Sequence, residues 1–226
     1  MTEITMQRIA TIHTDLPEKF GIPRQSQLVP ELTAKITFEE AYRNPESVRG
    51  LSDFDYIWLL WVFETGDRSF HATVRPPRLG GNTRMGVFAT RSPFRPNPIG
   101  LSCVRLLKVE QTEQGPVLTV SGADLKDGTA ILDIKPYLPY ADAYPNARGG
   151  FTQDPKAARP LLQVKIAEEL LQNIPEDKRE ALKGILAQDP RPAYIEDDER
   201  EYGMMFAGKN VRFSVSGDRL LVSNIT

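Results

Sequence analysis

The chain has 226 residues, 40% of them hydrophobic, and is long enough to bury a full core in one large domain or in a main domain with a smaller companion. Its formal net charge of -2 excludes a global basic field, so any contact with nucleic acid must come from a local patch. A single cysteine, Cys103, excludes an internal disulfide framework, and with only 2 histidines the sequence predicts no metal site.

The start of the sequence and its longest apolar run both argue against membrane association. Residues 1–5 carry no basic flank followed by an apolar segment, and the run at residues 56–63 is too short to span a bilayer. We therefore expect a cytoplasmic protein with no membrane partner.

Short strand patterns dominate the first part of the chain. Most of these segments alternate apolar and polar residues, whereas residues 56–63 form a continuous apolar run in which Trp58 and Trp61 are expected to lie in the core. The patterns predict strands at residues 4–12, 33–38, 56–63, 104–110, 117–120 and 130–134. Several short strands without long helices between them favour a small antiparallel β-barrel, with helix only at its edges, near residues 38–42.

An unusual charge pattern lies within the barrel sequence. Between Arg68 and Arg105 there are seven arginines and no lysine, aspartate or glutamate. Prolines deprive residues 75–102 of backbone donors that a core strand or helix needs, so a structured loop is expected. A guanidinium group grips phosphate or carboxylate with two parallel hydrogen bonds, which favours an anionic ligand. The alternative is that these arginines are solvated or pair with carboxylates elsewhere in the chain.

The character of the sequence changes near residue 145. We expect a β-barrel domain over residues 1–145 and a second domain over residues 146–226. In the second domain, residues 160–173 and 175–187 space their apolar side chains as two helices do, and residues 211–222 have a strand–turn–strand pattern. The predicted fold class is therefore mainly β, a small antiparallel barrel followed by a C-terminal α/β domain.

The motifs of the chain resemble those of the TrmO family, tRNA methyltransferases that use S-adenosylmethionine to methylate N6 of threonylcarbamoyladenosine at position 37, beside the anticodon. The resemblance rests on residues 19–25, 75–102, 124–140 and 189–194. The Gly-rich strand-to-helix turn of Rossmann methyltransferases does not occur in the sequence. The resemblance implies a barrel that binds the methyl donor, a C-terminal α/β extension, and a homodimer with cofactor sites near the subunit interface.

The family motifs also imply a set of residues that bind the methyl donor. These are Pro23, Arg24, Gln25, Glu64, Thr65, Arg91, Leu101, Asp124, Leu125 and Asp127. Either Arg24 or Arg91 can clamp the methionine carboxylate, and a carboxylate can bond the ribose hydroxyls. Leu101 can pack on the adenine, while backbone groups beside Asp124 can read the adenine edge. Asp124 and Asp127 have a second interpretation, an Asx-type turn before the next strand.

The resemblance further implies residues on the substrate side. Transfer from a sulfonium is an in-line displacement that needs no covalent enzyme intermediate, but a carboxylate that accepts the N6 proton assists it. Asp133 is the candidate for this catalytic role, and its alternative role is an ion pair with Lys135 on the same face of a strand. Residues expected to contact the modified base, the phosphates or the threonyl carboxylate are Arg75, Arg78, Arg84, Arg95, Asn97, Lys135, Tyr137 and Tyr140.

Two other functions remain open from the sequence. A non-catalytic RNA-binding module would keep the arginine surface without the methyl donor, and a methyltransferase for a small molecule would keep the donor without the tRNA. Donor binding distinguishes the first alternative, and dependence of the activity on salt and on an anticodon stem distinguishes the second.

Overall fold

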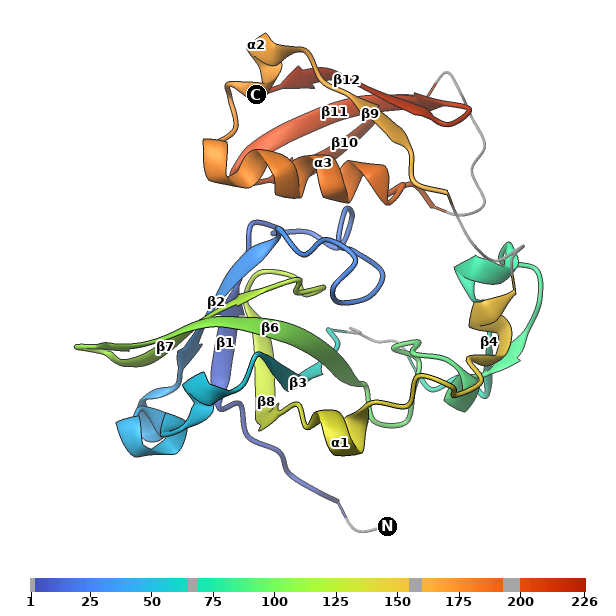
Figure 1. Ribbon diagram of the computed structural model, residues 1–226. Coiled ribbons are helices and arrows are strands. Elements are labelled where there is room, and N and C mark those ends of the chain that lie inside the picture. The colour runs from blue at the N-terminus through green and yellow to red at the C-terminus, as the bar shows by residue number, and fades with distance from the viewer. Residues whose placement is uncertain (1–2, 65–68, 155–159, 193–199) are drawn as a thin grey trace.

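The computed structural model describes residues 3–64, 69–154, 160–192 and 200–226 and contains two bodies, a barrel and a smaller sheet with helices (Figure 1). The strands are β1 Ala10–His13, β2 Thr33–Phe38, β3 Tyr56–Val62, β4 Thr73–Val74, β5 Met85–Gly86, β6 Ile99–Thr112, β7 Gly115–Ser121, β8 Thr129–Pro136, β9 Gln163–Lys165, β10 Tyr202–Phe206, β11 Lys209–Ser216 and β12 Arg219–Ile225. The α-helices are α1 Pro139–Asp142, α2 Glu168–Leu171 and α3 Arg179–Ala187. The 3-10 helices are η1 Glu40–Tyr42, η2 Pro45–Val48, η3 Leu51–Asp53, η4 Pro77–Leu79, η5 Val87–Ala89, η6 Gly150–Gln153 and η8 Glu176–Lys178.

The first body is a closed barrel with strand order β1-β2-β7-β6-β3-β8, in which every neighbouring pair is antiparallel. Alternate residues of each strand point inward, so Ile57, Leu59 and Trp61 of β3 are buried together with Ile36 and Val104 of the facing strands. The expected mainly β fold with an antiparallel barrel is therefore confirmed.

The individual barrel predictions differ in accuracy. The strand at residues 33–38 is confirmed as β2, but residues 4–9 lie outside any strand because β1 begins only at Ala10, where pairing with β2 and β8 starts. The prediction that Trp58 lies in the core was wrong. Trp58 is on the outward side of β3, half-buried, and donates its indole N–H to Asp142 Oδ2 at 3.0 Å.

The second body is a four-stranded sheet with order β10-β11-β12-β9. The predicted helix at residues 160–173 is wrong in its first half, which forms β9 and pairs parallel with β12. Residues 162–166 also alternate apolar and polar, and pairing with β12 favours the period of two. Helix survives as α2 and, for the second predicted helix, as η8 and α3, while the final hairpin is confirmed as β11 and β12.

The loop that joins β1 to β2 connects the two bodies. Leu16, Val29 and Leu32 from this loop are buried in the core of the C-terminal body, and Phe20 stacks on Tyr202 and Phe213 with ring centroids 6.4 Å from each. Figure 1 shows the loop rising from the barrel to α3. The C-terminal core is therefore completed by residues from the barrel side of the predicted boundary.

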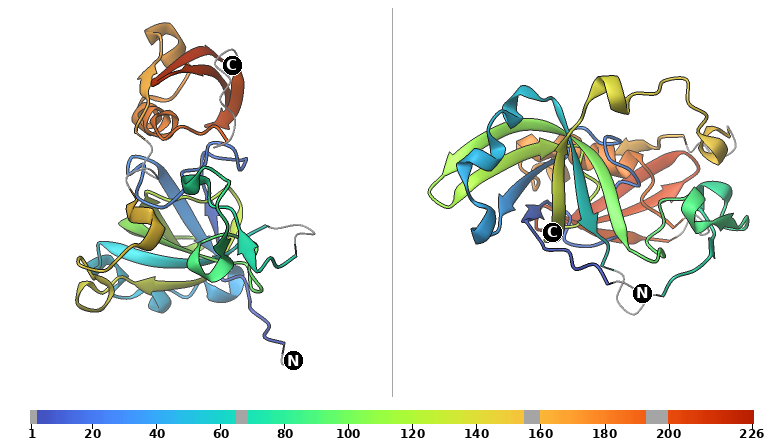
Figure 2. Two further views of the ribbon diagram at one scale, coloured as in Figure 1. Left: turned by 90° about the vertical axis from the view of Figure 1, so that its right-hand side faces the viewer. Right: turned by 90° about the horizontal axis from the view of Figure 1, so that it is seen from below.

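The arginine-rich segment forms a structured arm beside the barrel. It contains the small antiparallel pair β4 and β5 and the short helices η4 and η5 (Figure 2). No helix among the described residues is both long enough and apolar enough to cross a membrane.

Candidate functional site

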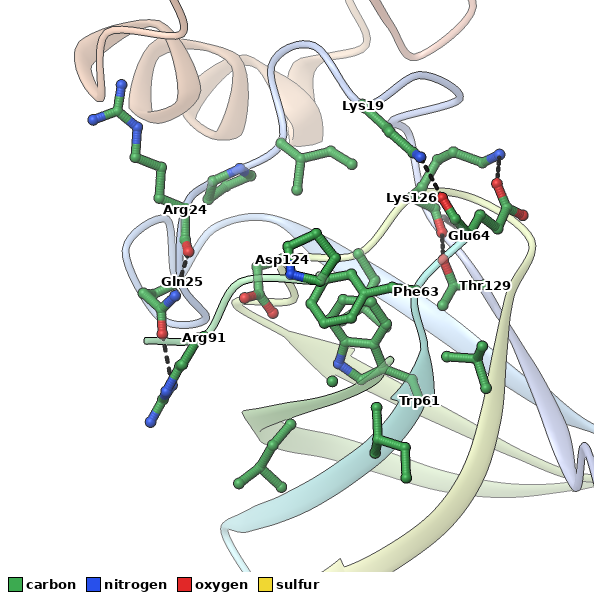
Figure 3. A pocket seen from close by; sticks show the side chains of 18 of the residues that line it. Lys19, Arg24, Gln25, Trp61, Phe63, Glu64, Arg91, Asp124, Lys126 and Thr129 are labelled. Carbon is green, nitrogen blue, oxygen red and sulfur yellow. Dashed lines mark hydrogen bonds and ion pairs between the residues drawn. The ribbon is translucent and has the colours of Figure 1, made fainter. Parts of the chain in front are cut away.

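A pocket of about 480 Å³ opens where one end of the barrel meets the loop between β1 and β2 (Figure 3). Its walls come from this loop, from the end of β3, from the arginine-rich arm, from the start of β6 and from the turn before β8. The lining residues are Lys19, Ile22, Pro23, Arg24, Gln25, Trp61, Val62, Phe63, Glu64, Thr90, Arg91, Pro93, Arg95, Ile99, Gly100, Leu101, Asp124, Leu125, Lys126 and Thr129.

An aromatic pair occupies the middle of the pocket. The rings of Trp61 and Phe63 are 4.2 Å apart at an angle of 59°. Trp61 is paired across the strands with Gly100, and a Cβ atom at Gly100 would lie 2.3 Å from Trp61 Cε2. Glycine is therefore needed at this position to let the indole lie flat against β6.

A hydrogen-bonded chain runs beneath this aromatic pair. Trp61 Nε1 donates to Ser102 Oγ at 3.0 Å, and Ser102 Oγ donates to Asp124 Oδ1 at 2.6 Å. Ser102 is fully buried. Burial raises the pKa of Asp124 above its ordinary value, and the hydrogen bond from Ser102 opposes this increase. Asp124 therefore presents a partly desolvated carboxyl group to the pocket.

Cations hold a second carboxylate at the rim. Lys126 Nζ donates to Glu64 Oε2 at 2.7 Å, and Lys19 Nζ donates to the backbone carbonyl of Glu64 at 2.6 Å. The hydrogen bond from Lys126 lowers the pKa of Glu64, so this group is an ionised acceptor at neutral pH.

Arginines and an amide stand on the other side of the aromatic pair, as Figure 3 shows. Arg91 Nη1 donates to Gln25 Oε1 at 2.6 Å, and Gln25 Nε2 donates to the carbonyl of Arg24 at 2.5 Å. Arg24 Nη2 reaches the backbone carbonyls of Asp189 and Arg191, both at 3.4 Å, and so links the pocket wall to the C-terminal body.

The pocket brings together most of the residues predicted to bind the donor. These are Pro23, Arg24, Gln25, Glu64, Arg91, Leu101, Asp124 and Leu125. Asp127 does not line the pocket, and its carboxylate instead accepts the backbone N–H of Thr14 at 3.0 Å, a long-range contact to the segment after β1 and not the local Asx-type turn of the alternative interpretation. Thr65 lies outside the described residues.

The residues predicted for the substrate side are spread more widely. Arg95 lines the pocket, but its guanidinium donates to the carbonyls of Val87 and Thr90 and braces the arm. Arg78 donates to the carbonyl of Thr152, and Arg84 to Thr73 Oγ1. Exposed positions on the arm are also held by Arg75 and Asn97.

The remaining substrate-side candidates gather on the outer face at the end of β8. Asp133 pairs with Lys135 at 2.9 Å, the alternative role that the sequence left open, and it does not line the pocket. Tyr137 packs against Trp58 with centroids 6.0 Å apart, and Tyr140 is 88% exposed in α1.

Sequence reasoning missed several lining residues. They are Lys19, Ile22, Trp61, Val62, Phe63, Thr90, Pro93, Ile99, Gly100, Lys126 and Thr129. Lys19 and Ile22 lie in the motif at residues 19–25, and Lys126 lies between Asp124 and Asp127, so proximity to the motifs was an available signal. The pairing of Trp61 with Gly100 depends on strand register, which the sequence pattern did not supply.

The pocket can bind a ligand that combines a flat ring system with charged and hydroxyl groups. The aromatic pair and Leu101 supply apolar surface, while Asp124 and Glu64 accept hydrogen bonds. Arg91 supplies a cation for an anionic group. No cluster of three or more His, Cys, Asp or Glu side chains suited to a metal occurs among the residues that the structure describes.

Comparison with known proteins agrees over both bodies. Two family models match, the tRNA-methyltransferase O N-terminal domain over residues 11–143 and the TrmO C-terminal domain over residues 159–226. The tRNA (adenine(37)-N6)-methyltransferase of Escherichia coli (strain K12) is 41% identical over 224 residues, which cover 96% of this chain and 95% of that protein. The protein of the same name from Eikenella corrodens is 45% identical over 174 residues, covering 76% of this chain and 97% of its own.

A solved structure extends the similarity to three dimensions. The crystal structure of TrmO from Pseudomonas aeruginosa superposes with a TM-score of 0.78 at 33% identity, and the match covers 100% of both chains. The fold of both bodies is therefore shared with a known protein. The chain belongs to the tRNA-methyltransferase O (TrmO) family.

Proposed function

We propose that this protein is an S-adenosylmethionine-dependent tRNA methyltransferase that methylates N6 of the adenosine at position 37, where that adenosine already carries a threonylcarbamoyl group. The observation that carries the proposal is the end-to-end similarity to a tRNA (adenine(37)-N6)-methyltransferase, and the segment that lines the pocket lies within the span of the N-terminal family model. The chemistry of the pocket supports the same activity.

The pocket suits the methyl donor in size and in chemical character. At about 480 Å³ it lies within the range of small-molecule sites. Leu101 and the aromatic pair suit the adenine ring, and Glu64 suits the ribose hydroxyls because its carboxylate stays ionised. Arg91 is placed to attract the methionine carboxylate, with Gln25 holding its guanidinium in position.

The catalytic task of the chain is positioning. Bound S-adenosylmethionine supplies an electrophilic methyl group on a sulfonium, so no nucleophilic side chain is required. The pocket walls hold the donor in line with N6 and exclude water from the reacting atoms. Asp133 remains our candidate for accepting the N6 proton, although its pairing with Lys135 means that it must give up this ion pair to do so.

The arginine-rich arm is the proposed tRNA-binding surface. Arg75, Arg78 and Arg84 are exposed on it, and guanidinium groups suit phosphates as well as the threonyl carboxylate. Tyr137 and Tyr140 on the outer face offer rings on which an unstacked base can lie.

We also propose that the protein is a cytoplasmic homodimer that works without a metal. The outward side of β6 exposes Leu101 and Leu107 by 45% and 48%, and α1 and its following turn expose Tyr140 and Tyr144. Leu101 also lines the pocket, which supports a subunit interface beside the donor site. Light scattering of the wild type and of Leu107→Arg tests the dimer, and a monomeric wild type contradicts it.

The decisive experiment compares tRNA from cells that can and cannot make the threonylcarbamoyl modification. Purified protein with labelled S-adenosylmethionine should methylate the first tRNA far faster than the second. Comparable rates would move the function toward unmodified adenosine, and no transfer despite tRNA binding would favour a non-catalytic RNA-binding module. Transfer to a free nucleoside at the same rate as to tRNA would favour a small-molecule methyltransferase.

A further inference from the structure

While Asp124 is ionised, the hydrogen bonds from Trp61 through Ser102 to Asp124 run in one direction. An indole N–H can donate but cannot accept, so Ser102 Oγ must accept from Trp61. A serine hydroxyl has one hydrogen, which is then directed at Asp124 Oδ1, 2.6 Å away. The ionised Asp124 carboxylate therefore accepts from Ser102 through Oδ1.

The hydrogen bond from Ser102 leaves Asp124 able to accept from a bound ligand. An ionised carboxylate offers about four acceptor positions, and Ser102 takes one of them. The backbone amides of Ser26 and of Asp124 itself favour the ionised form by lowering its pKa. The remaining acceptor positions belong to a carboxyl group that lines the pocket.

Packing holds the Trp61 indole, the first group in this series of hydrogen bonds, in place. Trp61 is 9% exposed, and its ring lies over Gly100 and against Phe63. Ser102 is fully buried on β6, so its hydroxyl has no water with which to exchange its partner. The orientation of Asp124 is thus set by the barrel itself and not by a mobile surface group.

We propose that Ser102 is a positioning residue for methyl-donor binding, which fixes Asp124 so that its carboxylate accepts a hydrogen bond from an N–H or O–H group of the bound donor. The inference rests on the proposed use of this pocket for S-adenosylmethionine, which offers such groups on its ammonium, its ribose and its adenine. Ser102 itself does not line the pocket and acts only through Asp124.

This role makes a specific prediction about pH. Protonation of Asp124 removes an acceptor, so donor binding should weaken as the pH falls through the pKa of Asp124, which burial has raised. Arg91 is the charged side chain whose field acts on this carboxylate, and its charge does not change in the relevant range. Glu64, whose pKa is lowered by the hydrogen bond from Lys126, lies beyond Phe63 from Asp124 (Figure 3).

The test is calorimetric titration of S-adenosylmethionine into the full-length wild type and Ser102→Ala between pH 4.5 and 8. At neutral pH we expect Ser102→Ala to weaken binding about tenfold, the loss expected for a hydrogen bond to a charged group. The acid limb is the part of the curve of affinity against pH in which binding weakens as the pH falls. Because the Ser102 hydroxyl lowers the pKa of Asp124, removal of this hydroxyl should move the acid limb to higher pH. Ser121→Ala, which truncates a buried serine on β7 away from the pocket, is the matched control and should leave both quantities unchanged.

A double substitution separates positioning from general packing. In Asp124→Asn the acid limb assigned to Asp124 should vanish, and adding Ser102→Ala should then cost much less than tenfold. Equal costs in the two backgrounds, or an unmoved acid limb in Ser102→Ala, overturn the inference. A wild type that does not bind S-adenosylmethionine contradicts the proposed function instead. If Ser102→Ala does not fold, Ser102→Cys, which is close in size but only a weak donor, carries the same prediction.

Discussion

At the scale of single residues, Gly100 is a position where the side chain of a residue on the neighbouring strand requires glycine. Gly80, Gly81, Gly86 and Gly100 all lie in the segment of residues 75–102. Gly80 and Gly81 do have positive φ angles of 69° and 73°, but Gly100 has no positive φ and is instead required by the Trp61 ring. Only the pairing of β3 with β6 reveals this requirement.

Gly100→Ala should therefore damage both the stability and the site. The added Cβ would lie 2.3 Å from Trp61 Cε2, so the indole must move, and overpacking of this kind costs about 1–3 kcal/mol in the free energy of unfolding. Moving the indole also releases its hydrogen bond to Ser102, so S-adenosylmethionine should bind less tightly.

Urea unfolding and calorimetric titration measure the two effects, and Gly86→Ala provides the control. Gly86 lies at φ -57° with no atom within 4 Å of an added Cβ, so its substitution should be close to neutral for stability. Equal effects of the two substitutions would show that the ring of Trp61 adapts without cost.

Two arginines of the arm should separate donor binding from RNA binding. Arg91 lines the pocket and is aligned by Gln25, so Arg91→Ala should weaken S-adenosylmethionine binding by about tenfold or more. Arg78 does not line the pocket, and Arg78→Ala should mainly weaken tRNA binding. Fluorescence titrations with each ligand check this division, which fails if both variants lose both ligands equally.

At the scale of elements, the loop between β1 and β2 has two roles that no local sequence pattern predicts. Its residues 22–25 form one wall of the pocket, while Leu16, Val29 and Leu32 complete the C-terminal core. The barrel strands could be predicted because most of them carry their own alternation of apolar and polar residues, and β3 is a continuous apolar run of strand length. The same reasoning failed for β9, whose three residues become a strand only by pairing with β12.

Leu16→Ala tests the coupling between this core and the pocket. Leu16 is fully buried, so its truncation should reduce the free energy of unfolding by about 2–5 kcal/mol. Because Leu16 holds the loop between β1 and β2 in place, its truncation should also make residues 22–25 of the pocket wall more mobile. S-adenosylmethionine binding should then weaken several-fold under conditions where the variant remains folded.

The matched control for Leu16 is Leu118→Ala in the barrel. Leu118 is equally buried on β7 but does not line the pocket, so it should lose comparable stability with a smaller change in donor affinity. Denaturant unfolding and calorimetry on both variants give the comparison. Identical losses of affinity would show that donor binding depends on the overall stability of the protein and not on the packing of Leu16 in particular.

At the scale of the whole molecule, the charge of the arginine-rich segment can be read from the sequence, but the direction in which each arginine points depends on the fold. The sequence alone indicated a local basic patch, because a net charge of -2 contrasts with an arginine-rich, acid-free segment. It did not indicate which arginines face outward. In the structure Arg95 turns inward to brace the carbonyls of Val87 and Thr90, whereas Arg75 and Arg84 are exposed. Such a division depends on the folded path of the arm.

The salt dependence of tRNA binding should report this division. Each phosphate contact releases condensed counterions, so the affinity falls with salt, with a slope that decreases by about 0.7–0.9 when one contact is removed. Arg75→Ala should show this smaller slope, because Arg75 is exposed on the arm and has no hydrogen bond or ion pair to another described residue. Arg95→Ala should instead lower the stability of the arm and change the slope little.

Arg49→Ala, which removes an exposed arginine paired with Glu46 near η2, is the control and should leave the slope unchanged. Filter-binding measurements across a salt series decide the matter, and an Arg49→Ala slope as reduced as that of Arg75→Ala would place the tRNA on a different face of the molecule.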